Sequence, residues 1–238
     1  MSTPAVAQRR GWVILATDTG VGKTFVGEHL ARALVAQGHT VRVRKPAESG
    51  CRERGDGAGA LRFAEDADRL RRAAGEIEAP ETVCPLRLLA PLAPPEAARR
   101  EGRTLTLSDD ILPALDPAGT SPDDIWLIEG AGGLHSPLSD DALNLELATA
   151  SGLPVILVAE DRLGTLSATL SAMESLDRRG IPVDAVVLNR HTPHEPDAPD
   201  NLAALRTWLP RVAPGFQGDL LAIDRNNVGA ALARLTPA

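Results

Sequence analysis

A glycine-rich octapeptide constrains the fold of this chain more than any other segment. Thr17-Asp-Thr-Gly-Val-Gly-Lys-Thr24 follows an apolar run, Trp12 to Ala16, that predicts a buried strand, and precedes a helical pattern over Thr24 to Gln37. Such a loop wraps a phosphate because glycine backbones approach it closely and the helix N-terminus supplies positive potential. We therefore predict a phosphate-binding loop between the first strand and the first helix of an α/β fold.

The residue types in this loop suit nucleotide binding. Lys23 is expected to reach the terminal phosphates, and the Thr24 hydroxyl is expected to bind Mg²⁺. The predicted phosphate contacts are completed by the backbone at four more positions, Gly20, Val21, Gly22 and Phe25. Thr17 stands where the strict pattern has glycine, so the alternative interpretation is an ordinary turn that contains Gly-Lys-Thr. The strand before the loop and the helix after it favour phosphate binding.

Apolar runs and helical patterns alternate along the rest of the chain, which is typical of a parallel sheet covered by helices on both faces. Further strands are predicted at His39 to Arg44, Ile125 to Ile128, Leu153 to Ala159, Val183 to Leu188 and Leu220 to Ile223. Helices are predicted at Thr165 to Arg179, at Asn201 to Leu209 and at the end of the chain up to Leu235. We expect a single P-loop α/β domain over 1–238 with a mostly parallel sheet, and a disordered leader over 1–10.

Four segments depart from this regular alternation. The polar, glycine-rich stretch Glu48 to Gly59 predicts a mobile loop, and a charged helix is predicted after it, from Leu61 to Ala74. The proline-rich segment Ala79 to Pro95 is expected to be irregular, because proline fixes φ and removes a hydrogen-bond donor. A second proline-rich segment, His191 to Pro199, predicts a linker.

Composition excludes several classes of protein. Hydrophobic residues make up 43% and charged residues 24%, as in ordinary globular proteins, and no apolar run suits a membrane span or a signal peptide. A net charge of −7 argues against nucleic-acid binding, since phosphate neutralisation needs a basic surface. Cys51 and Cys84 form neither a disulfide framework nor a metal-binding spacing, so reduced thiols are expected. We expect a soluble cytoplasmic protein without a membrane or nucleic-acid partner.

Only two lysines, Lys23 and Lys45, occur among the 25 basic residues, which suggests sites where a compact ammonium matters. Lys45 ends the second predicted strand in Lys45-Pro-Ala-Glu-Ser49-Gly. The proline keeps the lysine extended and ends the strand, which directs the ammonium across the crevice. The alternative interpretation is a surface lysine with its stem along apolar surface.

A carboxylate, Glu129, follows another predicted strand and runs into Gly-Ala-Gly-Gly133. Ligands of open α/β sheets gather at the carboxyl ends of the strands, so Glu129 should face the same crevice as the phosphate loop. Mg²⁺ commonly takes one or two carboxylates with a hydroxyl, phosphate oxygens and water. The sequence therefore predicts Mg²⁺ between Thr24 and Glu129, and the alternative is a carboxylate that caps a turn.

Together these motifs resemble the dethiobiotin synthetase family over most of the chain. The similarity rests on Thr17-Asp-Thr19 with Gly22-Lys-Thr24, Lys45-Pro with Ser49-Gly50, Glu129-Gly-Ala-Gly-Gly133, Leu153-Pro-Val-Ile-Leu-Val158 and Leu163-Gly-Thr165. It implies a homodimeric P-loop ligase of biotin biosynthesis. With ATP as co-substrate and Mg²⁺, such an enzyme converts 7,8-diaminopelargonic acid and CO₂ into the ureido ring of dethiobiotin.

This reaction implies roles for the residues of the crevice. One amine of the substrate takes up CO₂ to give a carbamate, ATP phosphorylates the carbamate oxygen, and the second amine attacks the mixed anhydride. By resemblance, Lys45, Lys23 and Thr19 are the catalytic residues, and Thr19, Lys45 and Ser49 contact the diamine or its carbamate. Donors for the developing negative oxygen are expected from both lysines and from the N–H groups of Gly130, Ala131, Gly132 and Gly133.

The resemblance also implies metal and nucleotide ligands. The implied metal ligands are Thr24, Glu129 and one aspartate after the loop. That aspartate is Asp66, because the family follows its loop with Asp-Ala; Asp68 and Asp56 remain alternatives. Asn189, at the end of a late strand, is implied in adenine recognition together with the turn Gly218 to Ala222, where Leu221 replaces a common proline.

The substrate carboxylate is expected to bind at the start of a helix supplied by the partner subunit. The family often carries asparagine there, where this chain has Ser167. The N–H groups at the helix start, Thr165 to Ser167, offer an alternative carboxylate contact.

Other P-loop classes fit the sequence less well. A partitioning-type ATPase, which acts as a nucleotide-dependent switch, needs an additional lysine early in the loop, where this chain has Asp18. A GTPase needs Asn-Lys-x-Asp, and neither lysine lies in such a motif. An amidotransferase-type synthetase for cobyrinate-like acids needs a glutaminase domain, for which we expect no room. The nucleotide-dependent switch remains the alternative function.

Overall fold

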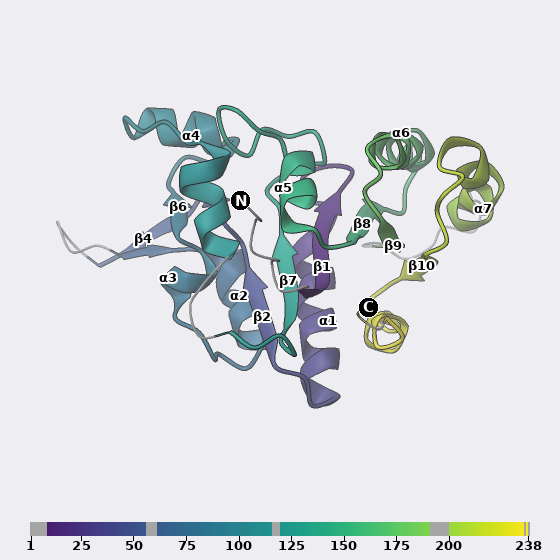
Figure 1. The fold of residues 1–238 in the computed structure, drawn as a ribbon, viewed down its shortest axis with the longest axis horizontal. Coiled ribbons are helices and arrows are strands. Elements are labelled where there is room, and N and C mark those ends of the chain that lie inside the picture. The colour runs from purple at the N-terminus through teal and green to yellow at the C-terminus, as the bar shows by residue number, and fades with distance from the viewer. Residues whose placement is uncertain (1–8, 56–60, 116–119, 191–199, 236, 238) are drawn as a thin grey trace, which may run out of the picture.

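A six-stranded parallel sheet forms the centre of the computed structural model, which describes residues 9–55, 61–115, 120–190, 200–235 and 237. The strands follow the order β10, β9, β8, β1, β7, β2, and every neighbouring pair is parallel (Figure 1). Their bounds are β1 Arg10–Ala16, β2 Val41–Arg44, β7 Ile125–Glu129, β8 Val155–Glu160, β9 Val183–Asn189 and β10 Asp219–Ile223. The predicted parallel α/β fold and each of its predicted strands are confirmed.

Helices cover both faces of this sheet (Figure 1). One face carries α1 Lys23–Ala36, α2 Glu65–Ala73, α3 Pro80–Val83 and α8 Val228–Leu232. The other carries α4 Pro94–Arg100, α5 Asn144–Ser151, α6 Thr165–Arg178, α7 Asn201–Val212 and the short helical turns Leu107–Ile111 and Leu112–Leu115. The predicted helices are thus present as α1, α2, α6, α7 and α8, whereas α3, α4 and α5 were not predicted.

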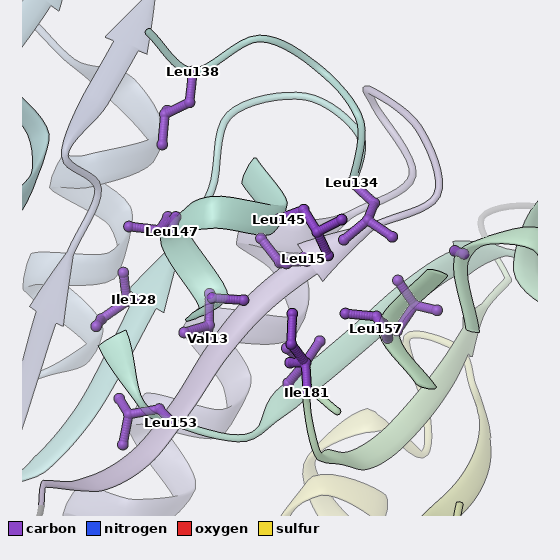
Figure 2. Close-up of a cluster of buried hydrophobic side chains, with 14 of the residues drawn as sticks. Val13, Leu15, Ile128, Leu134, Leu138, Leu145, Leu147, Leu153, Leu157 and Ile181 are labelled. Carbon is purple, nitrogen blue, oxygen red and sulfur yellow. The ribbon is translucent and has the colours of Figure 1, made fainter. Parts of the chain in front are cut away.

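Two hydrophobic cores follow from the alternation of side chains along each strand. On β1, Trp12 and Ile14 are buried on the α1 face, whereas Val13 and Leu15 are buried on the α5 face. Figure 2 shows the second core, in which Val13 and Leu15 gather with Leu145 of α5. Because both faces of β1 are buried, the loop that follows it is anchored at a fixed position at the sheet edge.

The segment predicted as a mobile loop, Glu48 to Gly59, contains short strands instead. β3 Ala47–Ser49 pairs in parallel with β6 Leu86–Leu88, and β4 Arg52–Arg54 pairs antiparallel with β5 Leu61–Phe63. The prediction was therefore wrong for β3 and β4, while its residues 56–59 lie outside the described residues. The charged helix begins at Glu65 rather than Leu61, because β5 takes up the first residues.

The proline-rich segment Ala79 to Pro95 is also more regular than predicted. It contains α3 and β6, and α4 begins in it with Pro94 and Pro95. Proline is compatible with the first turn of a helix, where its missing N–H has no intrahelical partner to lose. At the N-terminus, Arg10 already belongs to β1, and the rest of the predicted leader lies outside the described residues except Arg9. The predicted linker over 191–199 also lies outside them.

The remaining general features concern thiols and membranes. Cys51 and Cys84 are free, as the sequence predicted, and both are buried. In the part of the chain that the structure describes, no helix combines the length and the apolar character needed to cross a membrane.

Candidate active site

A cavity of about 470 Å³ opens at the carboxyl ends of three adjacent strands, β1, β7 and β2. β1 leads into the glycine-rich loop, β7 ends at Glu129, and β2 ends one residue before Lys45. Parallel strands bring such ends to the same sheet edge, which is why residues distant in the sequence share one crevice. Most of the predicted site residues line this cavity, namely Thr19, Gly20, Gly22, Lys23, Thr24, Phe25, Lys45, Ser49, Asp66, Glu129, Ala131, Gly132 and Asn189.

The glycine-rich loop presents the start of α1 to the cavity. Gly22 precedes the helix with φ of 102°, a left-handed conformation that favours glycine, and no side chain caps the helix. The first N–H groups of α1 therefore lack a capping side chain and can donate to an anion. This geometry is that of a phosphate-binding loop.

Lys23 lies across the loop and contacts backbone oxygens. Its ammonium donates to the carbonyl oxygens of Gly132, at 2.7 Å, and Asp18, at 3.4 Å. Burial lowers the pKa of Lys23, although the carboxylate of Glu129 opposes this effect. A nucleotide phosphate near this ammonium would compensate for the lost hydration and favour its charged form.

Glu129, Lys45 and Thr24 meet at the centre of the crevice. The Lys45 ammonium donates to Glu129 Oε1 at 2.5 Å, and the Thr24 hydroxyl donates to the same oxygen at 2.9 Å. Glu129 is 1% exposed, and its second oxygen, Oε2, is buried with no hydrogen-bond partner among the described residues. A buried, unpartnered carboxylate oxygen is costly unless a ligand uses it, so this atom suits a cation.

Asp66 is the aspartate that reaches this cluster. Its Oδ2 accepts a hydrogen bond from the Lys45 ammonium at 2.8 Å. Asp68, one of the alternatives, instead forms ion pairs with Arg71 and Arg72 of its own helix. The other alternative, Asp56, lies outside the described residues.

The charges in this cluster stabilise one another. Burial by itself would lower the pKa of Lys45, but the carboxylates of Glu129 and Asp66 outweigh it and hold that pKa above its ordinary value. Burial would likewise raise the pKa of Asp66, but the Lys45 ammonium outweighs it and lowers that pKa. The cluster therefore contains a protonated Lys45 and an ionised Asp66 at neutral pH.

The oxygen donors here fit a nucleotide-bound Mg²⁺ better than a metal held by protein alone. Thr24, Asp66 and Glu129 offer one hydroxyl and two carboxylates, which are the hard oxygen ligands that Mg²⁺ prefers. No group of three or more His, Cys, Asp or Glu side chains suited to a metal occurs among the described residues. Such a site leaves room for phosphate oxygens and water to complete the coordination.

Asn144 of α5 holds the loop after β7, and the sequence analysis missed it. Its side-chain oxygen accepts the N–H of Ala131, and its amide donates to the carbonyl oxygens of Ala131, Gly133 and Ser136. Gly130 packs so closely on Asn144 that a Cβ would lie 2.5 Å from the side-chain oxygen. Gly130 therefore serves loop packing and does not line the cavity, and nothing in the local sequence marks its partner.

The far end of the cavity lies beside Asn189. The buried amide of Asn189 donates to the carbonyl oxygen of Val21 at 3.0 Å, which ties the end of β9 to the glycine-rich loop. Val21 itself is buried and does not line the cavity. Two arginines not predicted from the sequence, Arg190 and Arg225, line the cavity near this point.

The cavity has lining residues that were not predicted, and two of the predicted substrate-binding residues lie away from it. Ala47, Glu48 and Arg69 also line it, although none was predicted. Thr165 and Ser167 lie in the first turn of α6 and do not line this cavity. Their predicted contact with the substrate therefore has no counterpart within a single chain.

The chain is similar to known proteins over most of its length. Residues 10–213 match a family model described as an AAA domain. An ATP-dependent dethiobiotin synthetase BioD from Anaeromyxobacter dehalogenans is 41% identical over 216 residues, which cover 86% of this chain and 92% of the relative. BioD from Rhodopirellula baltica is 38% identical over 217 residues, which cover 85% and 82%. Among solved structures, the signal recognition particle 54 kDa protein from Aeropyrum pernix K1, in complex with GDP, has a TM-score of 0.44 and 17% identity, covering 98% of this chain and 46% of that one.

Proposed function

The chain belongs to the ATP-dependent dethiobiotin synthetase family, a family of carbon–nitrogen ligases, and from that premise we propose how its crevice performs the reaction. The substrates are 7,8-diaminopelargonate, CO₂ and ATP, and the product is the cyclic urea dethiobiotin. The observation that carries this proposal is the Lys45 ammonium, held between Glu129 and Asp66 beside the phosphate-binding loop. A cation there faces both the terminal phosphate of a bound nucleotide and a carbamate next to it.

ATP binds with its phosphates on the glycine-rich loop. The N–H groups of Gly20 to Phe25 and the Lys23 ammonium surround the phosphate oxygens, and Lys23 exchanges its backbone carbonyl contacts for them. Asn189 contacts the base. The segment Gly218 to Ala222, predicted from the sequence as a second contact, is not a turn but runs into β10, and Gly218 lies beside Asp184 at the opposite, amino end of the strands, so that prediction was wrong. Thr24, Asp66 and Glu129 would hold Mg²⁺, which when bound would neutralise charge on the terminal phosphates. The unpartnered Oε2 of Glu129 supports this metal assignment.

Lys45 stabilises the negative charge that develops during phosphoryl transfer. The carbamate oxygen attacks the γ-phosphorus of ATP, the bond from phosphorus to the bridging oxygen breaks, and ADP leaves. Thr19 and Ser49 line the same cavity and orient the diamine or its carbamate. Preorganised donors of this kind typically accelerate a reaction by ~10²–10³-fold each.

Ring closure follows without a further cofactor. The second amine attacks the carbonyl carbon of the carbamoyl phosphate, the C–O bond to the phosphoryl group breaks, and phosphate leaves with the former carbamate oxygen. The amine loses a proton as the cyclic urea forms. The N–H group of Gly132, which lines the cavity, is the donor for the oxygen that becomes negative at this carbon, because the N–H groups of Ala131 and Gly133 already donate to Asn144 and Ser136.

The proposal is tested by product analysis with mass spectrometry. Protein mixed with ATP, Mg²⁺, bicarbonate and the diamine is expected to yield a product with the mass of the cyclic urea. Leaving out any one of the four should abolish that product. ATP hydrolysis that is independent of the diamine, with no cyclic urea, would favour the nucleotide-dependent switch instead.

We further propose that two copies of the chain form a homodimer through α6. Leu163 is 82% exposed just before this helix, and Leu166 and Leu170 on it are only half-buried, which leaves apolar surface for a partner. Ser167 is exposed beside these leucines, so a dimer brings it to the substrate carboxylate of the other copy, whereas Thr165 is buried and its N–H donates to the carbonyl oxygen of Arg162. Sedimentation at micromolar concentration should report about 50 kDa, twice the mass of one chain, for a two-fold dimer. A fully active monomer would refute both the dimer and the shared carboxylate site.

The cytoplasm is the compartment we propose for this enzyme. ATP is its co-substrate, and Cys51 and Cys84 are unpaired, which suits a reducing compartment. Localisation of a fluorescent fusion in cells tests this proposal, and accumulation outside the cytoplasm would contradict it.

A further inference from the structure

A buried glutamate that none of the roles above uses, Glu48, lies on β3 between Lys45 and Ser49. It is 7% exposed and lines the active-site cavity. Its two carboxylate oxygens accept the backbone N–H groups of Asp66, at 3.1 Å, and Ala67, at 2.9 Å. The carboxylate of Glu48 therefore points at the first turn of α2, and not into solvent.

This contact provides the cap that α2 lacks in its own sequence. Ala64 occupies the N-cap position with an extended backbone, and its side chain accepts no hydrogen bond. Capping residues normally accept the N–H groups of the second and third helical positions. In α2 these positions are Asp66 and Ala67, the two donors that Glu48 takes. A carboxylate at this place also interacts favourably with the helix dipole.

The same contact fixes the backbone of a proposed metal ligand relative to the catalytic lysine. Glu48 stands three residues after Lys45 on the same chain segment, whereas Asp66 follows only after the β4–β5 hairpin. The Asp66 side chain is 40% exposed, so packing alone does not fix its position. The Glu48 carboxylate accepts the N–H groups of Asp66 and of the next residue, Ala67, which holds the backbone here, while the Lys45 ammonium holds the Asp66 carboxylate at 2.8 Å.

We propose that Glu48 is a positioning residue that sets Asp66 for binding the divalent cation, by tying the start of α2 to the strand segment that carries Lys45. The inference rests on the metal assignment proposed above. Partners of metal ligands typically contribute 10–100-fold to metal affinity, because they orient the ligand before the metal arrives. Glu48 therefore acts through Asp66 and touches neither metal nor substrate.

Mn²⁺ binding in the presence of ATP, followed by electron paramagnetic resonance, tests the proposal without relying on turnover. Glu48→Ala should weaken Mn²⁺ binding by at least ~10-fold. Glu48→Gln keeps one acceptor oxygen and should give an intermediate loss, and it serves if the alanine variant fails to fold. Glu53→Gln, on the exposed strand β4, is the charge-matched control and should bind Mn²⁺ like the wild type.

A second substitution separates positioning from simple helix capping. In the double variant Glu48→Ala with Ala64→Ser, the serine hydroxyl can accept one of the same N–H groups but makes no connection to β3. The proposal predicts that this double variant regains thermal stability without regaining Mn²⁺ affinity. Recovery of both would overturn the proposal, as would wild-type Mn²⁺ affinity in Glu48→Ala or Glu48→Gln.

Asp66→Asn distinguishes a failure of this inference from a failure of the metal assignment. If Asp66→Asn weakens Mn²⁺ binding while the Glu48 variants bind normally, only the positioning role is wrong. If Asp66→Asn binds Mn²⁺ like the wild type, Asp66 is not a ligand, and the proposal for Glu48 is overturned with it.

Discussion

Replacement of Lys45 by methionine should destabilise the protein in the absence of metal. Methionine keeps the length of the side chain but removes the ammonium, which leaves the buried Glu129 carboxylate without its cation at 2.5 Å. The side chains of Lys45 and Glu129 are 6% and 0% exposed, so solvent cannot replace the lost partner. Removing one member of a buried pair typically costs about 3–5 kcal/mol. The exposed Asp66 adds little to this figure.

Thermal unfolding followed by circular dichroism in EDTA measures this loss. For a chain of this size each kcal/mol lowers Tm by roughly 2–4 °C, so we expect Lys45→Met to lower it by roughly 6–20 °C. Mg²⁺ should raise the Tm of Lys45→Met more than that of the wild type, because a cation then replaces the missing charge beside Glu129 and displaces no ammonium. Arg178→Met, which breaks an exposed ion pair with Glu174, is the control and should change Tm by at most about 2 °C.

A Lys45→Met variant with a Tm within about 2 °C of the wild-type Tm, which is the range expected for the control, would refute this reasoning. It would mean that Glu129 finds another partner, so that Lys45 does not stabilise it. An identical response of both proteins to Mg²⁺ would separately contradict the placement of the ammonium at the metal site.

Three further predictions concern the lysines, the loop after β7 and the thiols. Lys45→Ala should lower kcat by at least ~10²-fold, and Lys45→Arg should also lower it substantially, both with little change in ATP affinity. Lys23→Ala should instead weaken ATP binding and turnover together. A Lys45→Arg enzyme at the wild-type rate would show that diffuse positive charge suffices at this position. Asn144→Ala should lower the free energy of unfolding, measured with denaturant, by about 1–3 kcal/mol, and it should raise the KM for ATP because it frees the loop that carries Gly132. Unchanged stability and an unchanged KM would contradict this. Burial raises the pKa of Cys51 to about 11, so the neutral thiol dominates at pH 8. Labelling of Cys51 by a thiol reagent should therefore be roughly 100-fold slower in the native protein than in the unfolded chain, and it should accelerate as the pH rises toward that pKa. Fast labelling of the native protein at pH 8 would contradict the burial of this thiol.

Local patterns predicted the sheet and the phosphate loop well because the relevant residues are neighbours in the sequence. The apolar run before Thr17 and the helical period after Lys23 identify the loop from both sides. Glu129 and Lys45 were predicted for a related reason, since Glu129 ends one strand, Lys45 directly follows another, and parallel strands end at one edge.

The features that were missed are not marked by the local sequence pattern. β4 reads Arg-Glu-Arg, which carries no apolar alternation, and is a strand because it pairs with β5. α4 begins with two prolines that a local pattern interprets as irregular chain. Glu48 and Asn144 act on backbone groups of other segments, so their own neighbours in the sequence do not reveal their roles.

Transfer of oxygen from bicarbonate to phosphate tests the central chemical claim most directly. In a single turnover with ¹⁸O-labelled bicarbonate, quenched before the label exchanges with water, mass spectrometry of the released phosphate follows the carbamate oxygen. Our account predicts one ¹⁸O in each phosphate at the enrichment of the bicarbonate, because the attacking oxygen leaves with the phosphoryl group. Unlabelled phosphate would mean that water attacks ATP, and would contradict carbamate phosphorylation in this crevice.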